Sequence, residues 1–495
     1  MTLPENNEND VLDDGLQAPP RILFWGLIAM VLLIFVGILA SIVVFREVLT
    51  PGQQQRVVDA VPFMRALLPP QPAPDSVLPT IASPNATAAM DLLNLEFSSP
   101  TDMPVVEITE ATEAVLPNPP TVIEPSATTQ PTEALPTPTP TLLPPTPTLL
   151  PPTPTEMPTE LPTQSAQIAT ATPNVVQSQP QFTRAISHVN DGFTWNRQTW
   201  NNCGATNITM AMSYYGWGRS QAFAESMIKP DREDKNVSPA ELVNFVNNNS
   251  DLRALYRVGG SMNLLRTLIY YQFPVVIERS HMFQGYDWLG HYQTMVGYDD
   301  TQRQFTIYDS FLGENTIETY TEVDTHWQAF NRVFVVVYEP AREAELFQLL
   351  GELADQERAA EVAFEIAQSE ARANPQNAFA WFNMGSSLVT LGRYQEASAA
   401  YDQAINLGLP WRMLWYQFGP YRAYYETGRY QDVLTYVANV LSTDGGQYVE
   451  ETYYWQGRAL LALGERTQAI SAFRRAVSQN RFFVDARQAL TELGA

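Results

Sequence analysis

Cysteine is almost absent from this sequence, since the 495 residues include one, Cys203. A single cysteine excludes an intramolecular disulfide and any metal site built from several thiolates. We expect no metal ion and no cofactor. The lone thiol is then either a small buried hydrophobic group or a reactive nucleophile.

Basic residues are also scarce, with 29 Lys and Arg against 53 Asp and Glu and a formal net charge of −24. Phosphate backbones are bound by clustered Lys and Arg, so this balance excludes a nucleic-acid partner. The sequence contains no GxxxxGK[ST] motif, so no nucleotide-binding transporter domain is expected.

One apolar run is long enough to cross a membrane. Residues 22–45 are twenty-four residues without a charge, and about 20 are needed to cross a ~30 Å hydrocarbon core. The run predicts a transmembrane helix at 22–45 that follows an acidic tail at 1–21. A cleaved signal peptide fits less well, because the run is too long and the leading segment is acidic.

The next segment, 46–183, is dominated by Pro and Thr, and most of the 38 prolines lie between Pro69 and Pro180. Such a composition cannot bury enough apolar surface to offset its ordering entropy, so we expect a disordered stalk biased to polyproline II. It resembles stalks that hold exported domains off a cell surface. We therefore expect the C-terminal domains to be extracytoplasmic. The arginines after the apolar run favour the opposite, cytoplasmic placement, which stays open.

Aromatic-rich, globular sequence begins near Arg184 and contains Cys203. Apolar residues after Cys203 recur at helical spacing until Gly216 ends the run. Cys203 is thus predicted at or just before a helix N-terminus. Unpaired N–H groups and the helix dipole there stabilise a thiolate.

A reactive thiol needs an imidazole to accept its proton. The histidines of the chain are His188, His281, His291 and His326. Around His291 two β-type runs, 292–298 and 304–308, flank a polar turn, which predicts a hairpin. If the hairpin folds about Asp300, facing residues have numbers that sum to about 600, and His291 meets Asp309 within one residue.

Asp309 could then hold one nitrogen of His291 and leave the other for the thiol. Gly290 removes a side chain beside the histidine, which would let a substrate backbone come close. Acyl transfer also requires donors for an oxyanion. Gln198 is suited to supply its amide next to the backbone N–H of Cys203, with Asn201 or Asn202 as alternatives.

These residues, in this order, resemble the cysteine peptidases of family 39, the papain-like branch that processes double-glycine bacteriocin leaders. The resemblance covers about 184–340 and implies an α+β papain-like domain with thiol peptidase activity. The implied roles are nucleophile for Cys203, general base and acid for His291, orienting residue for Asp309 and oxyanion donor for Gln198. Because no transporter module is present, the resemblance speaks to the type of reaction on a peptide or protein substrate, not to leader peptides.

A second interpretation is a catalytically inactive papain-like domain that acts with the C-terminal repeats as a cell-surface peptide-binding scaffold. Several nearby residues have ordinary expected roles. Trp288, Tyr292 and Tyr298 are expected to be core or rim aromatics, and His281 and His326 polar residues of a loop or helix. Glu278 ends the apolar run FPVVIE and could face the cleft, although a solvated strand end is the simpler account.

The rest of this domain reads as helices first and sheet after. Ser238 followed by Pro239 and Glu241 predicts a capped helix. SMNLLRTLIYYQF predicts another helix, and PVVIE and VFVVVYEP predict strands.

Beyond Pro340 the sequence becomes helical and repetitive. Gly392, Gly428 and Gly464 are 36 residues apart. Gly385, Tyr421 and Gly457 keep the same spacing, as do Tyr401, Val437 and Phe473. The ladder resembles tetratricopeptide repeats, in which small residues let paired helices pack closely and an aromatic fills the gap between them.

We therefore predict an all-α tetratricopeptide-like domain at 341–495, with helices over Arg342 to Ala373 capping the front and Phe483 to Leu493 the back. The middle copy is degenerate, with Tyr421 where a glycine is usual. Such arrays present a groove for a protein or peptide partner, although bracing of the peptidase-like domain explains the helices equally well.

Overall fold

The computed structural model describes residues 21–45, 57, 61, 64, 77–80, 86–97, 183–282 and 287–495. The acidic tail and most of the predicted stalk lie outside them. Near the N-terminus the chain forms helix α1 (Arg21–Val43). A search of the described residues finds no helix with the length and hydropathy that a membrane crossing requires. The anchor at 22–45 therefore stays a prediction.

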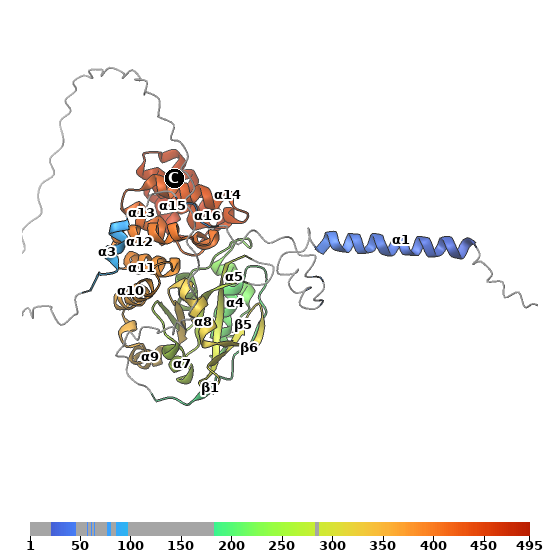
Figure 1. Cartoon of the computed structure of the whole chain (residues 1–495), viewed down its shortest axis with the longest axis horizontal. Coiled ribbons are helices and arrows are strands. Elements are labelled where there is room, and N and C mark those ends of the chain that lie inside the picture. Colours follow the sequence, from blue (N-terminus) through green and yellow to red (C-terminus); the bar gives the residue numbers. More distant parts are fainter. Residues whose placement is uncertain are drawn as a thin grey trace, which may run out of the picture. The chain divides into compact units, whose positions relative to one another are not determined.

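One antiparallel sheet organises the domain that begins at residue 183 (Figure 1). Its strands are β1 (Ser187–Val189), β2 (Arg253–Arg257), β3 (Val275–His281), β4 (Leu289–Asp299), β5 (Gln304–Asp309), β6 (Gly313–Thr319) and β7 (Phe334–Tyr338). They are ordered β2-β7-β3-β4-β5-β6, and β1 pairs with β4. The strands expected at PVVIE and VFVVVYEP are β3 and β7.

Helices cover both faces of this sheet. They are α4 (Cys203–Ser213), α5 (Gln221–Ile228), α6 (Pro239–Asn249), α7 (Met262–Tyr270) and α8 (Tyr320–Trp327). Val276 packs in one core with residues of α4, α5 and α6, whereas its neighbours Val275 and Ile277 pack in the other with residues of α7 and α8. This alternation follows from the two-residue period of a strand. The expected α+β layout, with the cysteine-bearing helix against the sheet, is confirmed.

Helix α6 begins as predicted. The Ser238 hydroxyl accepts the backbone N–H of Glu241, the Glu241 carboxylate accepts the backbone N–H of Ser238, and Pro239 occupies the first turn. The helix expected in SMNLLRTLIYYQF is α7, capped by Ser261. Such caps are local interactions, so they could be predicted without the tertiary fold.

The hairpin expected around His291 forms from β4 and β5, but its register differs from the expected one. Asp299 pairs with Gln304 and Thr294 with Tyr308, and a β-bulge lies between Met295 and Gly297. The partner numbers therefore sum to 602 or 603 rather than about 600. The shift arises because the turn is centred between Thr301 and Gln302 and not on Asp300, which gives a sum of 603 next to the turn. The bulge adds an unpaired residue to β4 and lowers the sum to 602 beyond it.

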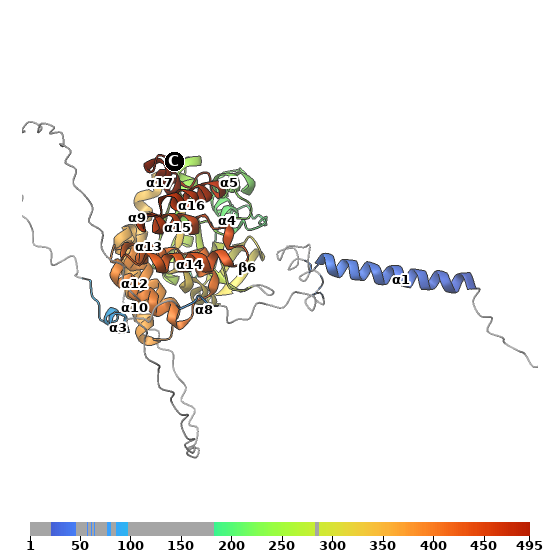
Figure 2. The same ribbon diagram turned by 90° about the horizontal axis from the view of Figure 1, so that it is seen from above.

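The C-terminal helices form three successive pairs within residues 378–479 (Figure 2). The pairs are α11 (Ala378–Thr390) with α12 (Tyr394–Leu407), α13 (Gly419–Glu426) with α14 (Tyr430–Ser442), and α15 (Glu450–Ala462) with α16 (Arg466–Gln479). The second helices begin 36 residues apart, as the ladder predicted. Short helices η7 (Trp411–Trp415) and η8 (Gly446–Tyr448) lie between them.

Helices also lie on either side of the three pairs. In front are α9 (Glu343–Leu350) and α10 (Gln356–Ala373), and behind is α17 (Val484–Glu492). Both sets match the predicted capping segments.

The glycines of the ladder allow close packing, as expected. A Cβ at Gly385 would lie 2.7 Å from the ring of Tyr401, and one at Gly457 would lie 2.5 Å from the ring of Phe473. In the middle pair Tyr421 is at the glycine position, and Val437 is at the aromatic position. The large and small side chains have exchanged places, so this pair still fills its core.

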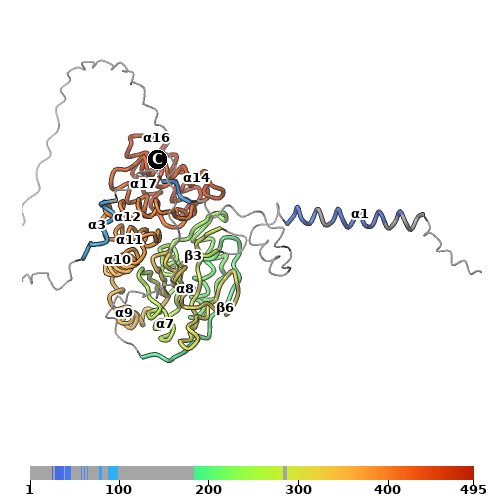
Figure 3. Tube along the Cα trace, in the orientation of Figure 1, coloured from blue at the N-terminus to red at the C-terminus, as the bar shows by residue number. Residues whose placement is uncertain are grey.

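A helix inside the predicted stalk range was not expected. Helix α3 (Ala86–Leu92) packs against α12, and the two lie side by side in the Cα trace (Figure 3). The Gln368 side chain donates to the carbonyl of Leu92 at 2.8 Å, and the backbone N–H of Leu78 donates to the carbonyl of Leu409 at 2.9 Å. Leu78 and Leu92 are buried, so this segment gains its order from apolar contact with the repeats.

Candidate active site

Cys203 is the first residue of α4, as the sequence predicted. Its side chain is half-buried and lines a cavity of about 780 Å³. Asn202, which precedes it, makes no side-chain capping hydrogen bond. The first N–H groups of the helix are therefore not satisfied by a cap, which suits a negative charge at this position.

A buried lysine supports the turn before the cysteine. The Lys229 side chain is 1% exposed, and its Nζ donates to the carbonyls of Asn201 at 2.8 Å and Asp234 at 3.1 Å. Sequence reasoning missed Lys229, because nothing near it in the chain indicates that its ammonium is buried. It fixes the loop behind Cys203 and places a positive charge near the thiol.

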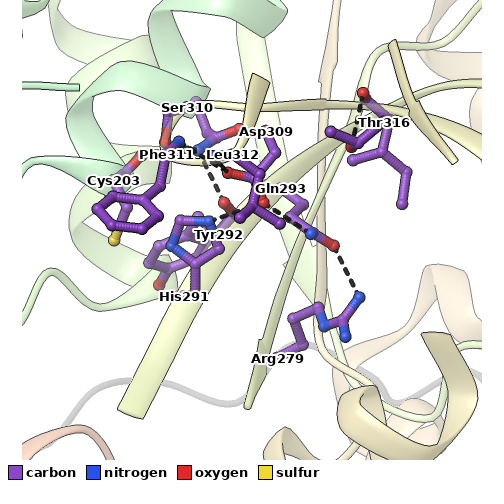
Figure 4. Close-up of polar contacts among 12 residues, drawn as sticks. Cys203, Arg279, His291, Tyr292, Gln293, Asp309, Ser310, Phe311, Leu312 and Thr316 are labelled. Atoms are coloured by element: carbon purple, nitrogen blue, oxygen red, sulfur yellow. Dashed lines mark hydrogen bonds and ion pairs between the residues drawn. The ribbon is translucent and has the colours of Figure 1, made fainter. Parts of the chain in front are cut away.

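The structure brings the predicted triad together (Figure 4). His291 Nε2 lies 3.0 Å from Asp309 Oδ2, and the His291 ring interacts with the Cys203 thiol strongly enough to lower the pKa of the thiol. Since Asp309 takes Nε2, the nitrogen left for the thiol is Nδ1. The contact forms despite the shifted hairpin register, because Asp309 ends β5 and its side chain reaches across to β4.

Asp309 is fully hydrogen-bonded as an anion. Its Oδ1 accepts the backbone N–H groups of Phe311 at 2.7 Å and Leu312 at 2.8 Å, and its Oδ2 accepts Gln293 Nε2 at 2.8 Å as well as His291. Burial opposes the charge, but His291 and these donors outweigh it and hold the pKa of Asp309 below its usual value.

The same contacts polarise the Cys203 and His291 pair. Burial alone would raise the pKa of Cys203, but the hydrogen bond and charge of His291, the backbone N–H of Tyr292 and the charge of Lys229 together lower it. Burial alone would lower the pKa of His291, whereas Asp309 and Cys203 raise it to about 10. Opposite shifts of this kind favour a thiolate beside an imidazolium at neutral pH.

Gln293 connects the Asp309 carboxylate to a further ion pair. Its Nε2 also donates to Glu318 at 2.9 Å, and Arg279 donates to its Oε1 at 3.0 Å. Arg279 forms an ion pair with Glu318 and is almost fully buried. The sequence offered no signal for this network, because its members come from four different strands, β3, β4, β5 and β6.

Gln198 lies at the rim of the same cavity. Its backbone N–H donates to the carbonyl of Ser310 at 2.8 Å, and its Oε1 accepts the Ser310 hydroxyl at 2.7 Å. These bonds orient the amide. Of the alternatives, Asn201 also lines the cavity, whereas the Nδ2 of Asn202 is taken by Gln221 at 3.0 Å.

Two expectations near the site were wrong. Glu278 is not a solvated strand end but is 4% exposed and lines the cavity, because β3 continues to His281. Gly290 does not leave room for a substrate backbone. A Cβ there would lie 2.8 Å from Phe330 and 3.0 Å from Tyr416, so aromatic rings fill the space.

The remaining histidines lie at different distances from the site. The ring of His281 is 6.0 Å from that of His291, and His326 Nδ1 is 3.1 Å from the Ser280 hydroxyl. Burial and the neighbouring His291 lower the pKa of His281 to about 3. His188 lies on β1, where its Nε2 is 2.8 Å from Asn190.

Comparison with known proteins agrees with this architecture. Residues 175–339 match the Peptidase_C39 like family, and residues 380–407 and 450–482 match a tetratricopeptide repeat. A crystal structure described as a C39-like peptidase from Bacillus anthracis aligns with 30% of this chain and 96% of its own, at 14% identity and a TM-score of 0.26. No curated protein matches the chain. The chain thus contains a C39-like peptidase domain followed by tetratricopeptide repeats, an arrangement that fits peptide or protein binding.

Proposed function

We propose that the chain is a thiol peptidase that hydrolyses peptide bonds through Cys203, His291 and Asp309. The observation that carries the proposal is the position of the His291 ring, which contacts the buried carboxylate of Asp309 at 3.0 Å and lines the same cavity as the Cys203 thiol, whose pKa it lowers. This is the arrangement that nucleophilic acyl transfer requires.

In the proposed reaction Cys203 Sγ attacks the carbonyl carbon of the scissile bond. The imidazolium of His291 then gives a proton to the leaving amine, and a thioester remains. Water attacks the thioester as His291 accepts its proton, the acid product leaves, and the thiolate is restored. The Gln198 amide and the backbone N–H of Cys203 would donate to the oxyanion of each tetrahedral intermediate.

Alkylation of Cys203 tests the activated pair directly. Because the chain holds one cysteine, iodoacetamide labelling reports on this thiol alone. The wild type should react rapidly at pH 6, since thiols paired with an imidazolium have pKa values well below the ordinary value of about 8.5. In His291→Gln the rate at pH 6 should fall by about 100-fold and recover only as the pH approaches 8.5.

His188→Gln is the matched control, because His188 lies on β1 and does not line the cavity. It should label like the wild type. Slow labelling that is equal in the wild type and in His291→Gln would overturn the proposal and leave a binding scaffold.

We further propose that the domains are held at a membrane and face away from the cytoplasm. The uncharged run at 22–45 and the Pro- and Thr-rich composition of 46–183 support this placement. The full chain should stay in the membrane pellet after alkaline carbonate extraction, and a protease added to intact cells should degrade the C-terminal domains. Release of the chain by carbonate would contradict the anchor, and protection from the protease would reverse the orientation.

A further inference from the structure

The cavity at Cys203 has walls from both parts of the chain. The peptidase-like domain contributes, among others, Cys203, Gly290, His291 and Glu278. The repeats contribute Arg412, Trp415, Tyr416, Asp444, Gly445 and Tyr448. All six repeat residues lie between α12 and α15, in or beside the degenerate middle copy.

The middle copy reaches the cavity because its chain leaves the regular repeat. Helix α12 ends at Leu407, and α13 begins only at Gly419 and has 8 residues, against 13 in α11 and α15. The residues between the two helices contact the peptidase-like domain beside the start of β4. Trp411 Nε1 donates to the Asp287 carboxylate, and the Tyr416 ring packs on Gly290, next to the candidate base.

Arg412 is held in this wall by aromatic rings rather than by an anion. Its guanidinium carbon lies 4.5 Å from the ring centre of Trp411 and 5.3 Å from that of Trp415. Among the residues that the structure describes, its Nε is buried without a hydrogen-bond partner, and its Nη1 makes a long contact of 3.5 Å with the carbonyl of Trp288. Stacking of this kind orients the guanidinium and leaves donors for a ligand.

Trp415 adds a second unsatisfied donor to the same wall. This residue is 4% exposed and lines the cavity, and its Nε1 has no hydrogen-bond partner in the described part of the chain. A buried N–H without a partner costs free energy that a bound acceptor would recover. Both unsatisfied groups are donors, so the missing partner is an acceptor such as a carboxylate.

The charges of the cavity agree with a negatively charged ligand. Arg197, Arg232 and Arg412 line it, and none of the three lies in an ion pair among the residues that the structure describes. Of the carboxylates that line the cavity, Glu233 forms an ion pair with Lys235 at 3.4 Å, and the charge of Asp444 also attracts the Lys235 ammonium. Burial raises the pKa of Glu278 well above its usual value, which disfavours its charged form. The cavity is thus positive in a chain whose formal charge is −24.

We propose that the middle repeat forms the specificity wall of the cleft and that Arg412 binds a carboxylate of the substrate. This inference rests on the proposed peptidase function and deepens it: the substrate class is peptides with an acidic side chain near the scissile bond. The repeats then select the substrate within the catalytic cleft itself.

Peptide pairs that differ by one Asp or Asn, placed in turn at each position around the scissile bond, test the inference. At one position the wild-type full chain should cleave the Asp peptide with a kcat/KM about 10- to 100-fold above that of the Asn peptide, the range expected for a charge-assisted hydrogen bond. In Arg412→Gln that ratio should fall close to one, mainly through a higher KM for the Asp peptide. Arg412→Lys should keep part of the ratio, because it retains the charge but not the planar fork.

Arg481→Gln is the matched control, because Arg481 also stacks on a ring of the repeat domain, Phe482 at 4.7 Å, but does not line the cavity. Its ratio should equal that of the wild type, and thermal melting of each variant checks the fold. Equal cleavage of Asp and Asn peptides by the wild type, or an unchanged ratio in Arg412→Gln, would overturn the inference and leave the peptidase proposal intact.

Binding of the same peptides to Cys203→Ala, followed by tryptophan fluorescence, separates the two proposals. Tighter binding of the Asp peptide that Arg412→Gln abolishes would support the acidic-ligand site even if no peptide were cleaved. Equal binding of both peptides would contradict it.

Discussion

Cys203→Ala and His291→Ala should each lower the kcat of peptide hydrolysis by about a million-fold, the loss typical when one member of a catalytic unit is removed. The physical reason is that neither group is effective alone. The thiol needs the imidazole to stay ionised, and the leaving amine needs a proton that only the imidazolium beside Cys203 can supply.

The double variant should be no less active than either single variant. Residues that act as one unit lose their contribution together, so the effects do not add. This non-additivity is measured from the hydrolysis rates of the three variants, with His188→Gln as the control. A thiol reagent titrates the active sites of the proteins that keep Cys203. Losses that multiply in the double variant would mean that the two side chains act independently, which contradicts a hydrogen-bonded pair.

The free energy of unfolding should fall as the pH rises from about 4 to about 7. The reason is that the contact between the two domains contains a group of buried carboxyls whose pKa values are raised. Asp234 and Glu241 belong to the peptidase-like domain, and Glu450 and Glu451 begin α15. Asn480 links the two sides, with Nδ2 at 2.8 Å from Glu450 Oε1 and 3.5 Å from Glu241 Oε1.

Burial is the main cause of the pH dependence. It raises the pKa of Asp234 to about 7 and that of Glu241 to about 7, and it raises the pKa of Glu450 and of Glu451 well above the usual value. Below about pH 4 these carboxyls are protonated in both states. Between pH 4 and 7 the unfolded chain loses the protons and the folded chain keeps them, so unfolding becomes more favourable with each step in pH. Each unit of upward pKa shift costs about 1.4 kcal/mol once the pH exceeds the folded value.

Glu451→Gln should remove part of this pH dependence and raise the melting temperature at pH 8 more than at pH 5. The amide keeps an oxygen for Asn236 Nδ2, which lies 3.1 Å from Glu451 Oε1, so the packing is retained. Thermal melting across pH 5 to 8 measures the effect, with the exposed Glu426→Gln in α13 as the control. A melting temperature that rises from pH 5 to 8 in the wild type would show that these carboxyls fold as anions.

Local patterns in the sequence predicted much of the fold. The capping box of α6 and the helix that begins at Cys203 depend on residues within one or two turns of each other, and the ladder is a regular 36-residue spacing along the chain. All three are present. Helix caps and helical periodicity are short-range effects, which is why they can be predicted without coordinates. The order of Cys203, His291 and Asp309 along the chain also predicted side chains that the structure brings close together.

The sequence could not determine what depends on contacts between distant segments. The burial of Lys229 and Glu278, the network from Asp309 to Arg279, and the exact hairpin register follow from how strands and loops meet. A one-residue change in a turn or a bulge alters the register without any strong sign in composition.

By itself, then, the sequence determined that a helix begins at the sole cysteine, that a histidine and an aspartate follow on neighbouring strands, and that helical repeats come after them. Only the tertiary structure decided that Tyr416 and Arg412 of the middle repeat form a wall of the same cavity. In the sequence the middle repeat is a degenerate copy because Tyr421 is present where a glycine is usual. Its Tyr416 packs against Gly290 and Trp288, and such packing between segments more than 100 residues apart has no local signature.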